Sequence, residues 1–231
     1  MSKKKKESAP DQLESVESAL SRTEQFIENN QKTITTVVLA IIILVGGYLL
    51  FQKYYLTPIE TEAKEQMFRA EQYFAQDSFN LALNGDGNYL GFLDIIEEYG
   101  ISKSANLAHY YAGISYLKTG DYDQAIDHLK EFKVNDKILE PEKLGAIGNA
   151  YLEKGEMEEA LDYYRNAMDA DDNQFSTPLY MSKAAFVYEQ QGEYNEAIEL
   201  YNKIKQKYPN SAQSEEADKN IARLKVLSSS N

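Results

Sequence analysis

The sequence contains no cysteine, no tryptophan and only two histidines, His109 and His128. The absence of cysteine excludes disulfides, thiolate metal sites and thiol nucleophiles, and it suits an oxidising compartment. We expect His109 on a packing face and His128 on the surface of a second helix, with no repeated carboxylate pair around either, which disfavours metal or general-base chemistry. A glycine-rich phosphate loop and a serine-centred elbow are also missing. The sequence therefore predicts a protein that is not an enzyme and uses no metal or cofactor.

Positive charge is scarce and unevenly placed. The 231 residues carry 24 Lys and Arg against 37 Asp and Glu, a net charge of −13, which argues against nucleic acid as a partner because nothing offsets phosphate repulsion. Residues 1–32 hold six basic and six acidic residues, whereas residues 53–231 hold 18 basic and 31 acidic ones. Two parts of different charge suggest two different sides of a boundary.

Charge is entirely absent from residues 33–52, of which twelve are Leu, Ile, Val or Phe. As a helix this segment spans about 30 Å, the thickness of one hydrocarbon core. A buried helix of a soluble protein normally shows a polar face, and a cleaved signal peptide needs a small-x-small site, which does not follow Phe51. We therefore expect an uncleaved transmembrane helix that contacts the lipid bilayer.

The basic residues around this span predict its orientation. Six of them precede it, at Lys3 to Lys6, Arg22 and Lys32. Within about 20 residues beyond it there are only Lys53, Lys64 and Arg69. The excess on the first side predicts a cytoplasmic N-terminus, with the rest of the chain outside the cytoplasm.

Residues 1–32 are predicted to form a cytoplasmic segment with a short amphipathic helix. Apolar residues recur every seven positions, at Leu13, Leu20, Ile27 and Ile34, which places them in one helical stripe. Two interpretations remain open. The stripe docks on a membrane partner or at the lipid interface, or it is a lead-in with no specific partner.

A register of Tyr, Gly, an acidic residue and Ala occurs three times after the span, with successive copies 35 and 37 residues apart. The copies begin at Tyr116, Tyr151 and Tyr188. A period of this length is typical of a helix–turn–helix solenoid. The fold class is therefore all-α, with an N-terminal transmembrane helix followed by a solenoid. Its predicted helix pairs are 107–119 with 122–134, 141–154 with 157–170, and 178–191 with 194–208.

Weaker patterns flank these copies. Residues 59–100 are expected to form a degenerate first repeat, with helices over 59–83 and 89–99, and Pro58 is expected to interrupt the chain before it. The oxygen-rich cluster at residues 84–88 lacks the terminal Glu of a calcium loop and is read as a turn. Residues 211–227 have one apolar and one charged face, which predicts a helix that caps the stack.

Small residues explain the register physically. Gly113 and Gly148 are expected to let the paired helices approach closely. Gly120, Gly155 and Gly192 are expected to end each first helix in a left-handed conformation, which costs glycine least.

This pattern of a small residue, Tyr, Gly, an acidic residue, an aromatic residue and Ala resembles the tetratricopeptide repeat over residues 106–209. The first-helix Trp often seen in that family is replaced by His109, Leu144 and Met181. The resemblance implies a solenoid that binds proteins or peptides rather than one that catalyses a reaction.

The layout of the whole chain also resembles a family. A lead-in at residues 26–32, one anchor and a C-terminal repeat domain are similar to the ancillary subunit of the bacterial Sec translocon. That resemblance implies a single-pass protein of the bacterial inner membrane with its repeats in the periplasm. The implied partners are translocon subunits, periplasmic chaperones or secreted client proteins. The ending Tyr-Pro-Asn-Ser at residues 208–211 is also similar to repeats of Gram-negative envelope assembly lipoproteins.

The expected binding surface is the concave face formed by the first helix of each repeat. Its candidate residues are Tyr110, Ile114, Leu117, Asn149, Leu152 and Phe186, with Gly145, Ser182 and Glu189 at the remaining positions. One interpretation is a groove with apolar anchors, in which Asn149 bonds a peptide backbone. The other is that some of these residues contact a neighbouring helix or the capping helix.

The family's carboxylate clamp does not recur on this face. Repeats that grip Glu-Glu-Val-Asp tails use Lys and Asn here, whereas Tyr110, Ile114 and Leu179 occupy the clamp positions and Lys183 is the one basic residue among them. Cytosolic heat-shock-protein tails are therefore not the expected ligand. The main functional hypothesis is a membrane-anchored module that binds secreted clients or chaperones near the Sec translocon. The alternative is a structural scaffold for an envelope-assembly or cell-division complex.

Overall fold

The computed structural model describes the backbone of residues 9–229 and the side chains of residues 22–229. The chain divides into two compact units at Pro58 and Ile59. The basic cluster Lys3 to Lys6 and the side chains of Leu13 and Leu20 lie outside the described parts.

The first unit is built on α1 (Ala9–Phe51), a helix of 43 residues that contains the uncharged span. One helical stretch here is long and apolar enough to cross a membrane, by length and composition. None of its apolar window is buried by other parts of the described chain, and Ile43 and Leu44 are 64% and 72% exposed. A buried helix of a soluble core is therefore not what the described residues form.

The chain stays helical around Pro58, where the sequence predicts an interruption. A π-helix, η1 (Gln52–Leu56), leads directly into α2 (Thr57–Ala75). The backbone N–H of Thr57 donates to the carbonyl of Gln52, five residues earlier. Pro58 directly follows this wider turn, which gives its ring room inside the continuous helix. The predicted interruption is therefore wrong.

The second unit begins with a short-helix repeat. The predicted helix over 59–83 is broken at Asp77, whose φ of 55° is left-handed, so α2 is followed by a separate α3 (Phe79–Asn84). The next helix, α4 (Phe92–Glu98), starts later than expected because Gly91 is its N-cap and donates to the Asp94 carboxylate at 3.1 Å. Asp86 closes the turn between them by accepting the N–H groups of Asn88 and Tyr89.

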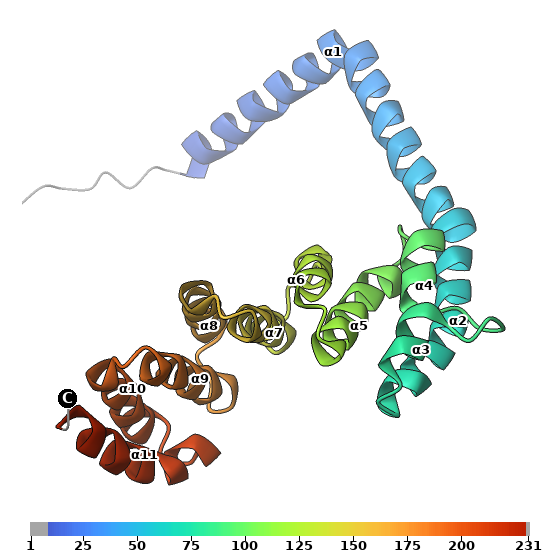
Figure 1. Cartoon of the computed structure of the whole chain (residues 1–231). Coiled ribbons are helices and arrows are strands. Elements are labelled where there is room, and N and C mark those ends of the chain that lie inside the picture. Colours follow the sequence, from blue (N-terminus) through green and yellow to red (C-terminus); the bar gives the residue numbers. More distant parts are fainter. Residues whose placement is uncertain (1–8, 230–231) are drawn as a thin grey trace, which may run out of the picture. The chain divides into compact units, whose positions relative to one another are not determined.

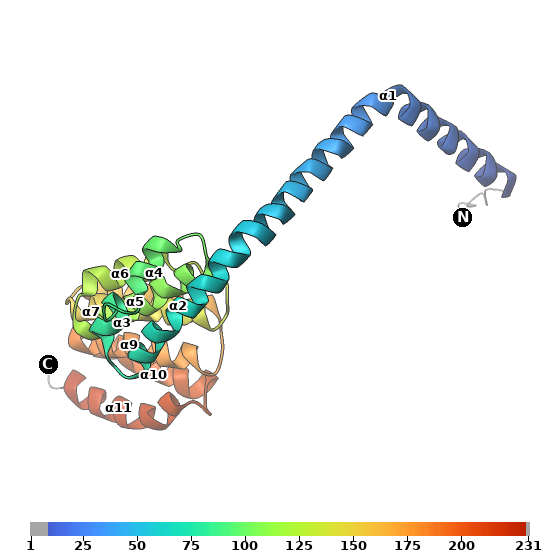
Figure 2. The ribbon, with the colours of Figure 1, turned by 90° about the vertical axis from the view of Figure 1, so that its right-hand side faces the viewer.

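Three helix pairs follow as the register predicts (Figure 1). They are α5 (Lys103–Thr119) with α6 (Tyr122–Glu131), α7 (Leu139–Glu153) with α8 (Met157–Ala170), and α9 (Ser176–Gln190) with α10 (Tyr194–Lys207). Figure 2 shows α11 (Ala212–Ser228) beside α10 at the end of this stack. Every regular element within residues 9–229 is helical.

The glycines act as the register predicts. A Cβ added to Gly113 would lie 2.6 Å from Cγ of Leu129, and one added to Gly148 would lie 2.7 Å from the ring of Tyr164. The three turn glycines, Gly120, Gly155 and Gly192, have φ of 88°, 81° and 80°. Close pairing and left-handed turns are both confirmed. The buried core follows the stack as four neighbouring clusters, from Ala63 at one end to Leu224 at the other.

Candidate protein-binding surfaces

Tyr110 and Ile114 lie on α5 and pack against the next repeat, each with part of its surface still exposed. Both are half-buried against the core between α6 and α7. The Tyr110 hydroxyl donates to Oε2 of Glu142 on α7 at 3.4 Å, and its ring lies 5.3 Å from that of Phe132. Burial, followed by the nearby Glu142 carboxylate, raises the pKa of Tyr110 to about 12. These two residues therefore join neighbouring repeats as well as lining the first-helix face.

Leu117, Asn149 and Leu152 are brought together in one depression. It has a volume of about 420 Å³, and Lys183 of α9 also lines it. Asn149 Oδ1 accepts from the Tyr164 hydroxyl at 2.9 Å and from Lys183 Nζ at 3.0 Å. The side-chain oxygen of Asn149 thus already accepts two hydrogen bonds from within the protein.

Lys183 is the electrostatic feature of this depression. It is half-buried, and burial lowers its pKa. Within residues 22–229, its one recorded polar contact is the neutral Asn149 side chain rather than a carboxylate. The depression therefore offers one half-buried cation beside the apolar side chains of Leu117 and Leu152, and the exposed Lys118 and Glu153 also line it.

Phe186 stands apart from this depression. It lies on α9 with 46% of its surface exposed and lines no part of the cavity around Asn149. Two further positions that were expected to line the groove are in contact with neighbouring parts of the protein. A Cβ on Gly145 would lie 1.9 Å from Cε1 of Tyr180, and Glu189 pairs with Arg223 of the capping helix. At Gly145 and Glu189 the second interpretation applies, because a neighbouring helix and the capping helix contact these two positions.

A second cavity was not predicted. It has a volume of about 360 Å³ and lies where the segment before α7 meets the start of α9. We name it the α7–α9 pocket; it is lined by Ile138, Glu142, Asp171, Asn173, Phe175, Ser176, Leu179 and Tyr180. Ile138 and Phe175 stand at helix starts outside the helical periodicity, so a search for repeat positions passes over them. The available signal was a large apolar residue in each inter-repeat segment.

The two histidines lie together between α5 and α6, with their Nδ1 atoms 3.1 Å apart. Their sequence positions did not reveal this contact. Across residues 22–229, no group of three or more His, Asp or Glu side chains is arranged to hold a metal ion.

Comparison with known proteins supports the repeat assignment. A tetratricopeptide-repeat family model matches residues 140–210 and another matches residues 107–136. A crystal structure of MamA protein has a TM-score of 0.57 at 20% identity, covering 72% of this chain and 82% of that one. A crystal structure of nearly identical TPR-like repeats, described as a Podosopora anserina kinesin light chain, has a TM-score of 0.58 at 14% identity, covering 74% and 89%. No curated protein sequence matches the chain.

The chain thus contains tetratricopeptide repeats on an all-helical solenoid. Repeats of this kind are protein–protein interaction modules, and their fold is a typical non-catalytic scaffold.

Proposed function

We propose that this protein is a membrane-anchored module of the bacterial cell envelope that binds other polypeptides through its repeat domain. The observation that carries the proposal is the presence, in one chain, of an uncharged 20-residue span and a solenoid of interaction repeats. The span anchors the protein in the inner membrane, with its N-terminus cytoplasmic and its repeats periplasmic, as the bias of basic residues suggests.

The bound polypeptide lies along the first-helix face, where Ile114, Leu117, Leu152 and Phe186 offer apolar contacts. Because Asn149 Oδ1 already accepts two hydrogen bonds, the amide nitrogen of Asn149 is the group left to bond a peptide carbonyl. Anchoring in the membrane raises the local concentration of this surface, which makes weak contacts effective.

The resemblance of the chain's layout to the ancillary Sec-translocon subunit supports a place beside the secretion channel. There the repeats assist secreted proteins by holding clients or recruiting periplasmic chaperones. This step rests on the resemblance, whereas the interaction role rests on the repeats themselves.

Site-specific photocrosslinking in living cells tests the proposal. A photoreactive residue at Ile114, Leu152 or Phe186 should capture exported chains or periplasmic chaperones, and one at the outward-facing Glu196 of α10 should not. Capture of one stoichiometric envelope protein would instead favour the scaffold alternative. Absence of any adduct from all three positions would overturn binding at this face. A reporter fused after Asn231 that is active only in the cytosol would overturn the periplasmic location.

A further inference from the structure

The α7–α9 pocket presents large apolar side chains to solvent at the start of two repeats. Phe175 is 86% exposed and Ile138 is 70% exposed, while Leu179 contributes a third apolar side chain from the first turn of α9. Scattered apolar residues are common on protein surfaces, whereas apolar residues gathered around one cavity are typical of interaction sites. The cavity, at about 360 Å³, lies at the small end of the range for ligand sites, so it suits one or two side chains.

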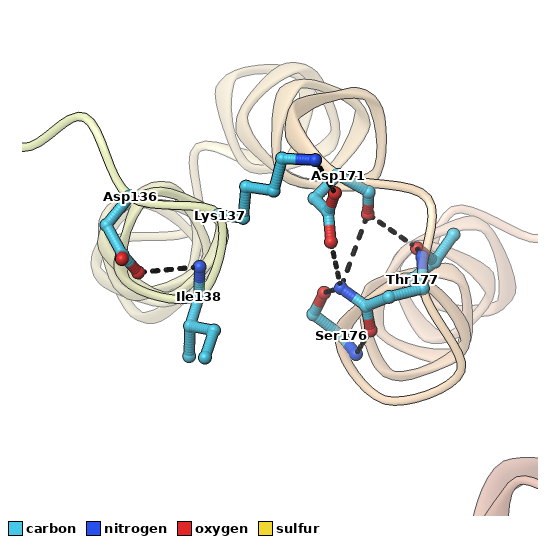
Figure 3. Close-up of polar contacts among 7 residues, drawn as sticks. Asp136, Lys137, Ile138, Asp171, Ser176 and Thr177 are labelled. Carbon is cyan, nitrogen blue, oxygen red and sulfur yellow. Dashed lines mark hydrogen bonds and ion pairs between the residues drawn. The ribbon is translucent and has the colours of Figure 1, made fainter.

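The backbone that carries Phe175 is held firmly by its own loop. Asn173 Oδ1 accepts the N–H groups of Phe175 at 2.7 Å and Ser176 at 2.8 Å. Thr177 Oγ1 accepts the N–H of Asn173 and donates to the carbonyl of Asp171, both at 3.0 Å. Figure 3 shows this network around Asp171, Ser176 and Thr177.

The segment that carries Ile138 is fixed in the same way. Asp136 Oδ1 accepts the N–H group of Ile138 at 2.8 Å (Figure 3). It also accepts the N–H group of Leu139 at 3.0 Å. Both exposed apolar side chains thus stand on backbone that is already ordered. A partner that contacts them loses less conformational entropy than one that must order a flexible loop.

The charge around the pocket indicates which partner fits. Glu142 and Asp171 both line it. Asp171 has one cation nearby, Lys137 at 4.0 Å, and the Lys137 side chain is 86% exposed. Within residues 22–229, Glu142 forms no ion pair, and its recorded partner is the Tyr110 hydroxyl. An apolar cavity with one carboxylate outside any ion pair of the described residues, and a second paired only at 4.0 Å with an exposed lysine, attracts a basic ligand and repels an anionic lipid surface.

From this pairing of an ordered apolar cavity with an acidic rim, we propose that the α7–α9 pocket binds an extended polypeptide segment in which a large apolar residue is flanked by Lys or Arg. The apolar side chain enters the cavity between Ile138, Phe175 and Leu179, and the cation lies against Glu142 or Asp171. The inference rests on the proposed function in that it requires the repeat domain to bind polypeptides. It adds a second site, apart from the depression around Asn149.

The sequence itself provides a direct test, because it contains no tryptophan. Phe175→Trp puts a single tryptophan at the pocket, whose emission is separated from that of the 18 Tyr by selective excitation. Phe186→Trp puts one on the first-helix face as a matched control. Each full-length variant is placed in phosphatidylcholine nanodiscs and titrated with the synthetic peptide Gly-Ser-Lys-Leu-Phe-Lys-Ser-Gly. The expected result is a saturable blue shift of the emission of Phe175→Trp. Replacing both Lys of the peptide with Glu should weaken binding at least about tenfold.

Further variants separate the possible outcomes. Adding Ile138→Ser or Glu142→Gln to Phe175→Trp should each weaken binding several-fold, and because Ile138 and Glu142 are exposed, neither change should unfold the domain. A shift only in Phe186→Trp would overturn the pocket proposal while leaving the proposed function intact. Equal binding of the Glu peptide would overturn the acidic rim's role, and no shift in either variant would overturn the pocket proposal. A blue shift of Phe175→Trp in phosphatidylglycerol nanodiscs without peptide would identify a membrane contact instead.

Discussion

The Nδ1 atoms of His109 on α5 and His128 on α6 lie 3.1 Å apart. A hydrogen bond between them needs one nitrogen to donate and the other to accept, so the two rings cannot both be protonated there. Burial lowers the pKa of both imidazoles, and the neighbouring ring lowers that of His128 further. The tilted pair joins the two helices of one repeat, and the Tyr116 ring stacks on His128 at 5.4 Å.

This histidine pair should make the repeat formed by α5 and α6 less stable in mild acid. The unfolded chain binds protons near the ordinary histidine pKa of about 6.5, whereas the folded pair binds them only at lower pH. Stability is therefore fully present above that value and is lost as the pH falls through the lowered folded pKa values. Glu131 opposes this shift for both rings and Asp127 for His128, while Lys133 reinforces it for His109.

Thermal unfolding of the full chain in mild detergent, followed by circular dichroism, measures the effect. The melting temperature should fall by several degrees between pH 7.5 and pH 5.5. His128→Gln, whose amide can still bond His109, should reduce that fall. An unchanged pH dependence in the variant would show that the pair does not carry the effect.

Glu60 of α2 caps the start of α5 across more than forty residues of sequence. Its Oε2 accepts the N–H groups of Lys103 at 2.7 Å and Ser104 at 3.2 Å, and Lys64 pairs with Oε1. Partial burial raises the pKa of Glu60, but these hydrogen bonds outweigh it and lower the pKa overall. Because a helix N-terminus favours a carboxylate, the contact should stabilise α5.

Glu60→Ala should lower the free energy of unfolding of the repeat domain by about 1–2 kcal/mol. Urea unfolding followed by circular dichroism measures the change. Glu65→Ala, which removes an exposed carboxylate from the same helix, should change stability by less than about 0.5 kcal/mol. Equal effects of the two variants would contradict a capping role for Glu60.

Gly145 makes room for the Tyr180 ring between α7 and α9. Because a Cβ here would lie 1.9 Å from Cε1 and 2.3 Å from Cζ of Tyr180, Gly145→Ala should destabilise the domain by about 1–3 kcal/mol. In a Tyr180→Leu background the same change should cost far less, since the ring that clashes is gone. Urea unfolding of the unmodified protein, the two single variants and the double variant measures the coupling between Gly145 and Tyr180. If Gly145→Ala destabilised the domain equally with Tyr or Leu at position 180, a clash with the Tyr180 ring would not be the cause.

The repeats could be predicted from the sequence because their determinants are local. Gly120, Gly155 and Gly192 mark left-handed turns at a fixed distance from each Tyr, and small residues mark close helix contacts. The break at Asp77 and the helical path through Pro58 were missed, because each depends on hydrogen bonds or turn geometry that composition does not encode.

The candidate surface was harder to predict than the fold. Repeat positions place Leu117, Asn149 and Leu152 on one face, and the structure does bring these three together. Position alone could not tell that the Tyr180 ring fills the space at Gly145 or that Arg223 reaches Glu189, since both contacts come from other elements. The α7–α9 pocket was missed because its most exposed residues lie outside the repeat positions.

Asn149 holds two donors from different helices, the Tyr164 hydroxyl of α8 and the Lys183 ammonium of α9. Asn149→Leu would leave the buried Tyr164 hydroxyl and the half-buried Lys183 ammonium without their acceptor. The change should lower the free energy of unfolding by about 1–3 kcal/mol. Adding Lys183→Met removes the stranded cation and keeps its aliphatic stem, so the double variant should be more stable than Asn149→Leu alone.

Urea unfolding of Asn149→Leu, Lys183→Met and the double variant gives the coupling between the two residues. Lys183→Met alone should be nearly neutral or mildly stabilising, because partial burial already disfavours the Lys183 cation and lowers its pKa. Additive effects, with no recovery in the double variant, would mean that the Asn149–Lys183 contact carries no net stabilisation. Lys183 would then be free to leave the depression and meet a carboxylate of a bound polypeptide.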